Sequence, residues 1–168
     1  MVFQNPVGSF DPRRTLGDGI GESLKNKGVS KAEIRAKVAE LLEQCGLEPE
    51  YMDRYPHQVS GGQCQRAAIA RALAIQPKLL ICDEATSALD VTVQKEIIDL
   101  LNQLRLAQGK HLSILFICHD LSLVQQFCDR VLVMYQGEIV EQGKPDDVIQ
   151  KPEHAYTRRL IDSVLEFE

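Results

Sequence analysis

Residues 79–84 read LLICDE, a short apolar run that stops at two consecutive carboxylates, Asp83 and Glu84. An apolar run without polar alternation is typical of a strand that is buried on both faces of a parallel sheet. The preceding segment from Gly62 to Ile75 is rich in alanine, which favours a helix, and Pro77 prevents that helix from continuing. The sequence therefore predicts a helix, a turn and a buried strand in that order.

A second apolar run, from Leu112 to Cys118, ends at His119 and Asp120. Residues 91–108 separate the two runs with an amphipathic helical pattern that ends at Gly109. The order strand, helix, strand predicts a parallel pair with a right-handed crossover. Ligands bind at the carboxyl edge of such sheets, and both runs end there in polar residues. We therefore expect a functional site at this edge.

The rest of the chain predicts smaller elements. Residues 1–29 show no sustained period and are expected to be loop and turn with room for one short helix. Ser30 and Glu33 form a capping box before an amphipathic helix that ends at Gly46. The elements expected after the second strand are a hairpin and two helices, at residues 131–140, 146–150 and 154–166.

The chain has 168 residues, a formal net charge of −5 and a sequence pI near 5.4. This acidic balance argues against binding to nucleic acid, which needs a clustered basic surface. The apolar runs are far shorter than the roughly 20 residues that cross a bilayer, and the first residues carry no pattern of an export signal. We therefore expect one cytoplasmic domain. Its five cysteines include no C-x-x-C pair and are expected to be reduced and to serve in packing.

Two short segments carry residue types suited to phosphate chemistry. Residues 59–63 read VSGGQ: the glycines let backbone approach a phosphate, the serine hydroxyl can donate to it, and the following helix offers its positive N-terminus. Asp83 and Glu84 at a strand end suit Mg²⁺ binding and water activation. Gln4, the segment SALD at residues 87–90 and His119 become candidates only through the resemblance described next. Each has a plain structural alternative, such as an acidic turn, a Gly-Gly turn before a helix, or a structural histidine.

Along the chain the order is Gln4, residues 59–63, Asp83 with Glu84, residues 87–90 and His119. Together and in that order, these motifs resemble those of ABC-type ATPases. The resemblance implies that Asp83, as the Walker B aspartate, holds the Mg²⁺ of MgATP, and that Glu84 polarises the attacking water. It implies that Gln4, the Q-loop glutamine, reaches the metal and that His119, the switch histidine, contacts the γ-phosphate. It also implies nucleotide contacts from the signature motif and the D-loop, at Ser60, Gly61, Gly62, Gln63 and Asp90. The implied cofactors are ATP and Mg²⁺.

Three further segments, residues 54–57, 87–94 and 152–158, are similar to the importer ATPases for dipeptides, oligopeptides and nickel. The fold implied is α/β and P-loop NTPase-like, with a parallel sheet core at about residues 76–168 and a helical subdomain at about residues 5–75. The implied partners are a second ABC ATPase subunit, transmembrane permease subunits and, indirectly, an extracytoplasmic substrate-binding protein. The chain would then lie at the inner face of the cell membrane as a peripheral subunit.

The sequence departs from the family in one large respect, because no G-x-x-x-x-G-K-[ST] phosphate loop, or Walker A motif, occurs in it. Family members place this loop, its strand and an N-terminal β subdomain before the Q-loop glutamine. We therefore expect a partial cassette that binds ATP poorly or not at all by itself. The strand at residues 112–118 would then lack its usual neighbour, which predicts self-association. Cys64 replaces a longer polar residue common in relatives, and we expect a modest effect.

Two other interpretations stay open. A non-catalytic cassette fragment would keep the family's fold without its activity. An ABC ATPase of chromosome maintenance or DNA repair would carry a very long coiled coil between Gln4 and Ser60. This chain has one amphipathic helix in that interval, which favours a transporter subunit.

Overall fold

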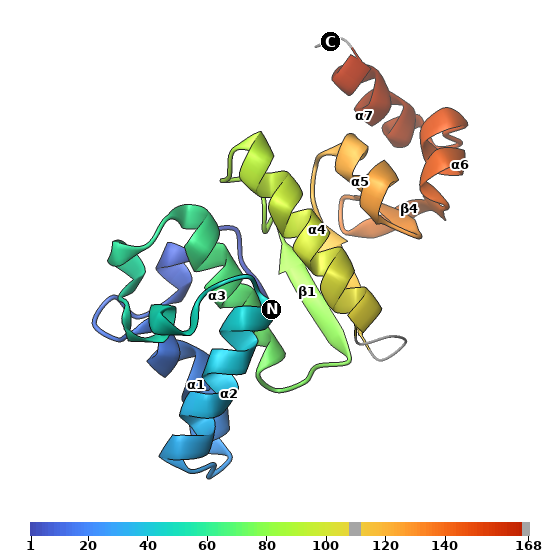
Figure 1. Ribbon diagram of the computed structural model, residues 1–168. Helices are drawn as coiled ribbons and strands as arrows, with labels where there is room; N and C mark the ends of the chain where they lie inside the picture. The colour runs from blue at the N-terminus through green and yellow to red at the C-terminus, as the bar shows by residue number, and fades with distance from the viewer. Residues whose placement is uncertain (108–111, 166–168) are drawn as a thin grey trace. The chain divides into compact units, whose positions relative to one another are not determined.

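The computed structural model describes residues 1–107 and 112–165, and the chain divides into two compact units (Figure 1). The first unit runs from Met1 to Ile117, and the second begins at Cys118. Parallel strands lie in the first unit and an antiparallel hairpin in the second. The division expected from the sequence, near residue 75, stays a prediction.

Four helices and two strands make up the regular structure in the described part of the first unit. They are α1 (Leu16–Asn26), α2 (Lys31–Gln44), α3 (Gly61–Leu73), β1 (Leu79–Asp83), α4 (Val91–Ala107) and β2 (Ser113–Ile117), with 3-10 turns at Val7–Ser9, Pro49–Asp53 and Pro56–Gln58. The predicted helices on either side of β1 are confirmed, and the short helix allowed before residue 29 is α1. The glycine expected to end α4 lies outside the described residues. No helix in residues 1–107 or 112–165 is long and apolar enough to cross a membrane.

A capping box starts α2, as predicted. The Oγ of Ser30 accepts a hydrogen bond from the backbone N–H of Glu33 at 3.3 Å, and the Glu33 carboxylate accepts one from the backbone N–H of Ser30 at 3.2 Å. The Ser30 hydroxyl and then the Ser30 backbone N–H, which both donate to the Glu33 carboxylate, hold the pKa of Glu33 below its usual value. The buried face of α2 includes Val38, Leu41 and Leu42, and the helix packs against α1 and α3. Helical spacing in the sequence thus builds a three-helix layer (Figure 1).

The strands β1 and β2 form the predicted parallel pair, with Leu79 beside Ser113 and Asp83 beside Ile117. On its other edge β1 pairs with Val2, which forms an isolated parallel bridge to Cys82. The strand β1 is therefore flanked on both edges by backbone running in the same direction. This register brings the first residues of the chain to the end of β1.

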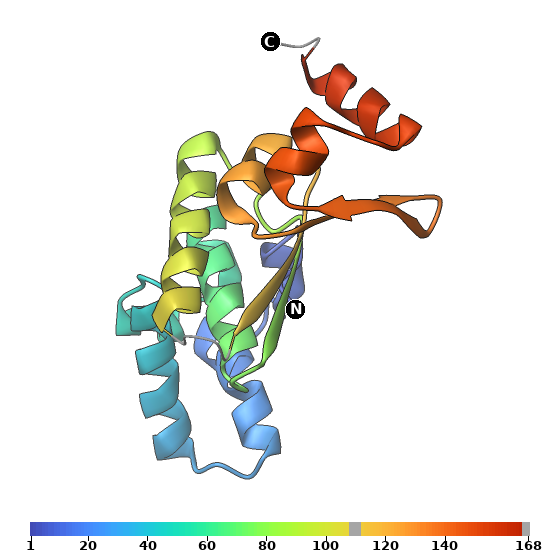
Figure 2. The same cartoon turned by 90° about the vertical axis from the view of Figure 1, so that its right-hand side faces the viewer.

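The two faces of the parallel pair are covered differently (Figure 2). The helices α3 and α4 lie against one face, where Leu80 and Cys82 are buried. On the opposite face, Leu79, Leu115 and Ile117 are 51%, 42% and 46% exposed. The prediction that β1 is buried on both faces is therefore wrong, because these two helices cover one face only. The expected self-association stays a prediction.

The second unit combines a hairpin with helices. Its described elements are α5 (Leu121–Phe127), β3 (Val131–Tyr135), β4 (Glu138–Gly143), α6 (Pro145–Gln150) and α7 (Ala155–Leu165). The predicted hairpin is confirmed, and Gln136 and Gly137 turn it with positive φ angles of 50° and 86°. The sequence interpretation missed α5. That helix begins after Asp120, whose carboxylate accepts hydrogen bonds from the backbone N–H groups of Ser122 and Leu123.

Candidate functional site

The end of β1 brings Gln4 and Asp83 to one edge of the sheet. The backbone N–H of Asp83 donates to the carbonyl of Val2 at 2.9 Å, and the N–H of Val2 donates to the carbonyl of Ile81 at 2.8 Å. Gln4 follows Val2 by two residues, and Asp83 directly follows Cys82, the partner of Val2. Asp83 is half-buried and Gln4 is exposed. The two residues predicted to reach the metal therefore share the carboxyl edge of the sheet.

Glu84 has a backbone φ of 46°, in the left-handed region that residues with a side chain rarely adopt. Its N–H donates to the carbonyl of Ile117 at 2.9 Å, and its carbonyl accepts from the N–H and Oγ of Ser87 at 3.1 and 3.0 Å. Such backbone strain costs about 1–3 kcal/mol and is typical of functional sites. The loop after β1 therefore holds the predicted general base in a conformation that its neighbours impose.

Ser60 begins α3 with a second capping box. Its Oγ accepts from the backbone N–H of Gln63 at 3.2 Å, and the Gln63 side-chain oxygen accepts from the N–H of Ser60 at 2.9 Å. The amide nitrogen of Gln63 donates to the hydroxyl of Tyr51 at 2.7 Å. Both ends of the Gln63 amide are thus engaged inside the protein, whereas Ser60 and Gly61 are exposed. The structure presents the N-terminus of α3 to the surface on a rigid cap.

The two glycines of this segment face the chain that leads into α4. A Cβ on Gly62 would lie 2.6 Å from Cγ1 of Val93, closer than real Cβ atoms approach, so a side chain there would force Val93 to shift. A Cβ on Gly61 would lie 3.6 Å from Cδ2 of Leu89, an ordinary contact. The predicted signature motif and D-loop, far apart in the sequence, therefore lie side by side in one unit.

Asp90 has a local role that the sequence interpretation missed. Its Oδ1 accepts a hydrogen bond from the N–H of Val93 at 3.0 Å, and its carbonyl accepts one from the N–H of Gln94 at 2.8 Å. Asp90 therefore caps the first turn of α4, as aspartate commonly does at helix starts. Its predicted contact with nucleotide stays a prediction.

Gln65 was also missed, and it joins the two halves of the site. This side chain of α3 is fully buried, and its amide nitrogen donates to the carbonyl of Ala85 at 2.6 Å. Ala85 directly follows Glu84, so α3 binds the loop that carries the predicted general base. The available signal was spacing, because Gln65 lies one turn before the buried Ile69 on the same helix face.

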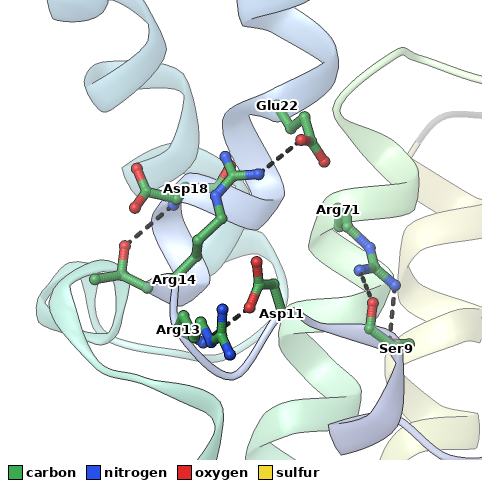
Figure 3. Close-up of polar contacts among 8 residues, drawn as sticks. Ser9, Asp11, Arg13, Arg14, Asp18, Glu22 and Arg71 are labelled. Atoms are coloured by element: carbon green, nitrogen blue, oxygen red, sulfur yellow. Dashed lines mark hydrogen bonds and ion pairs between the residues drawn. The ribbon is translucent and has the colours of Figure 1, made fainter.

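The same helix also binds the segment that follows Gln4 (Figure 3). The guanidinium of Arg71 donates to the carbonyl and to the Oγ of Ser9, and it lies 4.2 Å from the centre of the Phe10 ring. Burial lowers the pKa of Arg71. Across a cavity of about 60 Å³, Arg14 forms an ion pair with Glu22 at 2.7 Å. The helix α3 therefore contacts the segment after Gln4 through Arg71 and the loop after β1 through Gln65.

His119 lies in the second unit, two residues after the end of β2 and directly before Asp120, the cap of α5. No group of three or more histidine, cysteine, aspartate or glutamate side chains in the described residues could hold a metal ion by itself.

Burial raises the pKa of the Cys64 thiol to about 11 and that of Cys82 to about 12. These two thiols therefore stay protonated near neutral pH, which suits packing.

Comparison with known proteins places this geometry in a family. Residues 1–87, just over half of the chain, match the family described as ABC transporter. Two curated relatives are named "Oligopeptide transport ATP-binding protein OppF" (Escherichia coli strain K12) and "Glutathione import ATP-binding protein GsiA" (Pectobacterium atrosepticum). Each is 49% identical to this chain and covers 98% of it. The aligned region is 49% of the first relative and 26% of the second, so the chain spans about half the length of the first.

A solved structure agrees with the sequence relatives. The protein cbiO1 from Clostridium perfringens, described as part of the ABC transporter complex cbiONQ, superimposes with a TM-score of 0.78. It is 31% identical, and the match covers 99% of this chain and 64% of that one. The predicted α/β, P-loop NTPase-like fold class is therefore confirmed. This chain belongs to the ABC transporter family.

Proposed function

We propose that this chain forms the part of an ATP-hydrolysing importer subunit that carries the Q-loop, signature, Walker B and D-loop motifs. The observation that carries the proposal is the packing of the α3 N-terminus on the loop after β1, within one unit. In this proposal the start of α3, which binds phosphate, and the Glu84 carboxylate, which activates water, are held together in the first unit. The cargo class we propose is peptides, because the relatives named above carry oligopeptide and glutathione transport in their names.

The phosphate of ATP fits the exposed start of α3. Backbone N–H groups and the positive end of the helix dipole favour an anion there. The Oγ of Ser60 already accepts a hydrogen bond from Gln63, so its own proton can be donated to a phosphate oxygen. Because Ser60 and Gly61 are exposed, this end of the helix suits a nucleotide held on another subunit. We therefore propose a head-to-tail pair with a second ABC ATPase subunit.

The Mg²⁺ of MgATP fits Asp83 and Gln4 as a pair of oxygen ligands at the sheet edge. Magnesium bound to nucleotide takes one or two protein ligands and keeps waters and phosphate oxygens for the rest. When bound, the ion would neutralise charge on the phosphates, while Glu84 would accept a proton from the attacking water. His119 is proposed to contact the γ-phosphate.

Further partners follow from the importer assignment. We propose that the chain binds transmembrane permease subunits at the cytoplasmic face of a membrane and reaches a substrate-binding protein only through them.

The test uses a longer chain in which a Walker A segment from a relative precedes Met1. In that chain, Ser60→Arg should block ATP-dependent dimerisation and turnover, because it puts bulk and charge where the partner's nucleotide docks. ATP binding to the monomer should survive, as measured by fluorescent nucleotide titration. The matched control is Ser30→Arg at the capping box of α2, which should leave dimerisation and turnover unchanged. The signature assignment fails if Ser60→Arg changes neither.

A further inference from the structure

We propose that Gln65 is a positioning residue for Glu84, linking the conformation of the catalytic loop to the helix that begins at Ser60. The inference rests on the proposed ATPase function, since it concerns how the general base is held. Gln65 touches neither nucleotide nor metal in this proposal, and it acts through the peptide that follows Glu84.

The hydrogen bond that Gln65 donates is short and buried, and its acceptor is the carbonyl of the residue that follows Glu84. The amide nitrogen of Gln65 donates to the carbonyl of Ala85 at 2.6 Å. Gln65, Ala85 and Thr86 are 0%, 2% and 3% exposed, so water does not compete for this bond. A hydrogen bond to the Ala85 carbonyl restrains the peptide plane that adjoins the left-handed Glu84.

The other end of the same amide indicates why the residue is polar. The side-chain oxygen of Gln65 is buried and has no hydrogen-bond partner among the described residues. Burying an acceptor without a donor is unfavourable, and an apolar side chain of similar shape would avoid that cost. A core position occupied by a half-satisfied amide therefore points to a requirement for its N–H donor, which is the group that holds Ala85.

The hydrogen bonds that hold Glu84 and Ala85 come from different elements of the fold. The N–H of Glu84 is held by Ile117 of β2, and its carbonyl is held by Ser87 of the same loop. Of these contacts, only the bond to Ala85 comes from α3. A movement of α3 when a partner's phosphate docks at Ser60 would therefore reach the general base through Gln65.

The first experiment needs no nucleotide and uses the 168-residue chain. Gln65→Met keeps the length of the side chain but removes the donor, so amide hydrogen exchange at residues 84–87 should rise at least tenfold. The matched control is Ile69→Val, which shortens a fully buried side chain one turn further along α3. It should change exchange at residues 84–87 less than twofold. Equal exchange in the two variants would overturn the proposal. Should Gln65→Met not fold, Gln65→Asn, which withdraws the amide by one methylene, is measured in its place.

The second experiment uses the longer chain with a Walker A segment. Gln65→Met should lower kcat at least tenfold and leave KM for ATP within about twofold, because the positioning of Glu84 changes while nucleotide contacts stay. Ile69→Val should leave both constants unchanged. Parallel changes of KM and kcat in Gln65→Met would indicate general damage and contradict the inference. If the parent longer chain does not hydrolyse ATP but exchange at residues 84–87 responds to Gln65→Met, the proposed function fails and the structural link stands.

Discussion

The start of α3 and the loop after β1 lie in one unit, yet their backbones are stabilised in opposite ways. At the start of α3, Ser60 and Gln63 satisfy each other's polar groups in a helical geometry that local sequence favours. In the loop after β1, Glu84 adopts a left-handed conformation that local sequence disfavours and that Ile117 and Gln65 help to impose from outside the loop. The conformation of the helix start is therefore determined locally, whereas the conformation of Glu84, the proposed general base, depends on tertiary contacts.

The largest expected effect tests the catalytic role that is proposed for Glu84 in the loop after β1. In the longer chain with a Walker A segment, Glu84→Gln should lower turnover by about 10² to 10⁴, the usual range for losing a positioned general base. ATP binding should persist, because the substitution keeps the shape of the side chain. Steady-state ATPase rates and nucleotide titration measure the two quantities. The control is Glu43→Gln on the exposed surface of α2, and near-normal hydrolysis by Glu84→Gln would remove Glu84 from the catalytic role.

The next effect tests the packing between the two regions. Gly62→Ala should destabilise the chain by about 1–3 kcal/mol, because its Cβ would overlap Val93. Gly61→Ala is the matched control and should leave stability unchanged or slightly higher, since its Cβ would meet Leu89 at an ordinary distance. Urea denaturation followed by circular dichroism compares them. Similar losses in both variants would contradict the packing described for α3 and α4.

A smaller effect separates two roles of Ser60, the cap of α3 and the proposed contact with a partner's nucleotide. Ser60→Ala should destabilise by about 1 kcal/mol, because it removes the side-chain cap of α3. Ser30→Ala removes the same kind of cap from α2 and should cost a similar amount. In the longer chain, Ser60→Ala should also weaken ATP-dependent dimerisation, whereas Ser30→Ala should not. Equal effects of the two substitutions on dimerisation would leave Ser60 with a capping role alone.

The smallest expected effect has the opposite sign. Glu84→Gly should raise stability by up to about 1 kcal/mol, because glycine adopts a positive φ without a steric cost. Gln76→Gly, at a φ of 51° in the same unit, is the control and should behave similarly. Thermal unfolding of the two variants beside the parent chain measures the effect. A clear loss of stability in Glu84→Gly alone would show that the side chain, and not the backbone, dominates at this position.

Local patterns predicted much of the fold because their causes are local. The alanine-rich segment before Pro77 forms α3, the capping box at Ser30 starts α2, and the apolar run at residues 79–82 forms most of β1. Helix propensity, capping and the steric limits of proline act within a few residues. The P-loop NTPase-like fold class, by contrast, followed from the resemblance of the motifs to those of ABC-type ATPases.

The site residues could be proposed from motif order, but their arrangement could not. Spacing alone does not show that Gly62 packs on Val93, or that Asp90 caps α4 before any role with nucleotide. The first of these facts depends on how α3 and α4 pack together, whereas the Asp90 cap is a local contact that the motif assignment had hidden. Sequence patterns carry residue type and interval, and neither specifies the distance between two elements that are many residues apart.

The sequence by itself determined most of the helices and strands, because they depend on neighbours in the chain, and it also determined the acidic balance and the residue types proposed for phosphate chemistry. Tertiary structure alone decided which sheet face is exposed and that Glu84 adopts a left-handed backbone. It also decided that the buried Gln65 donates to the carbonyl of Ala85, the residue after Glu84. Exposure of an apolar strand depends on what packs against it, and backbone strain persists only where surrounding contacts compensate it. Both are properties of contacts between distant segments, so no local pattern of residues specifies them.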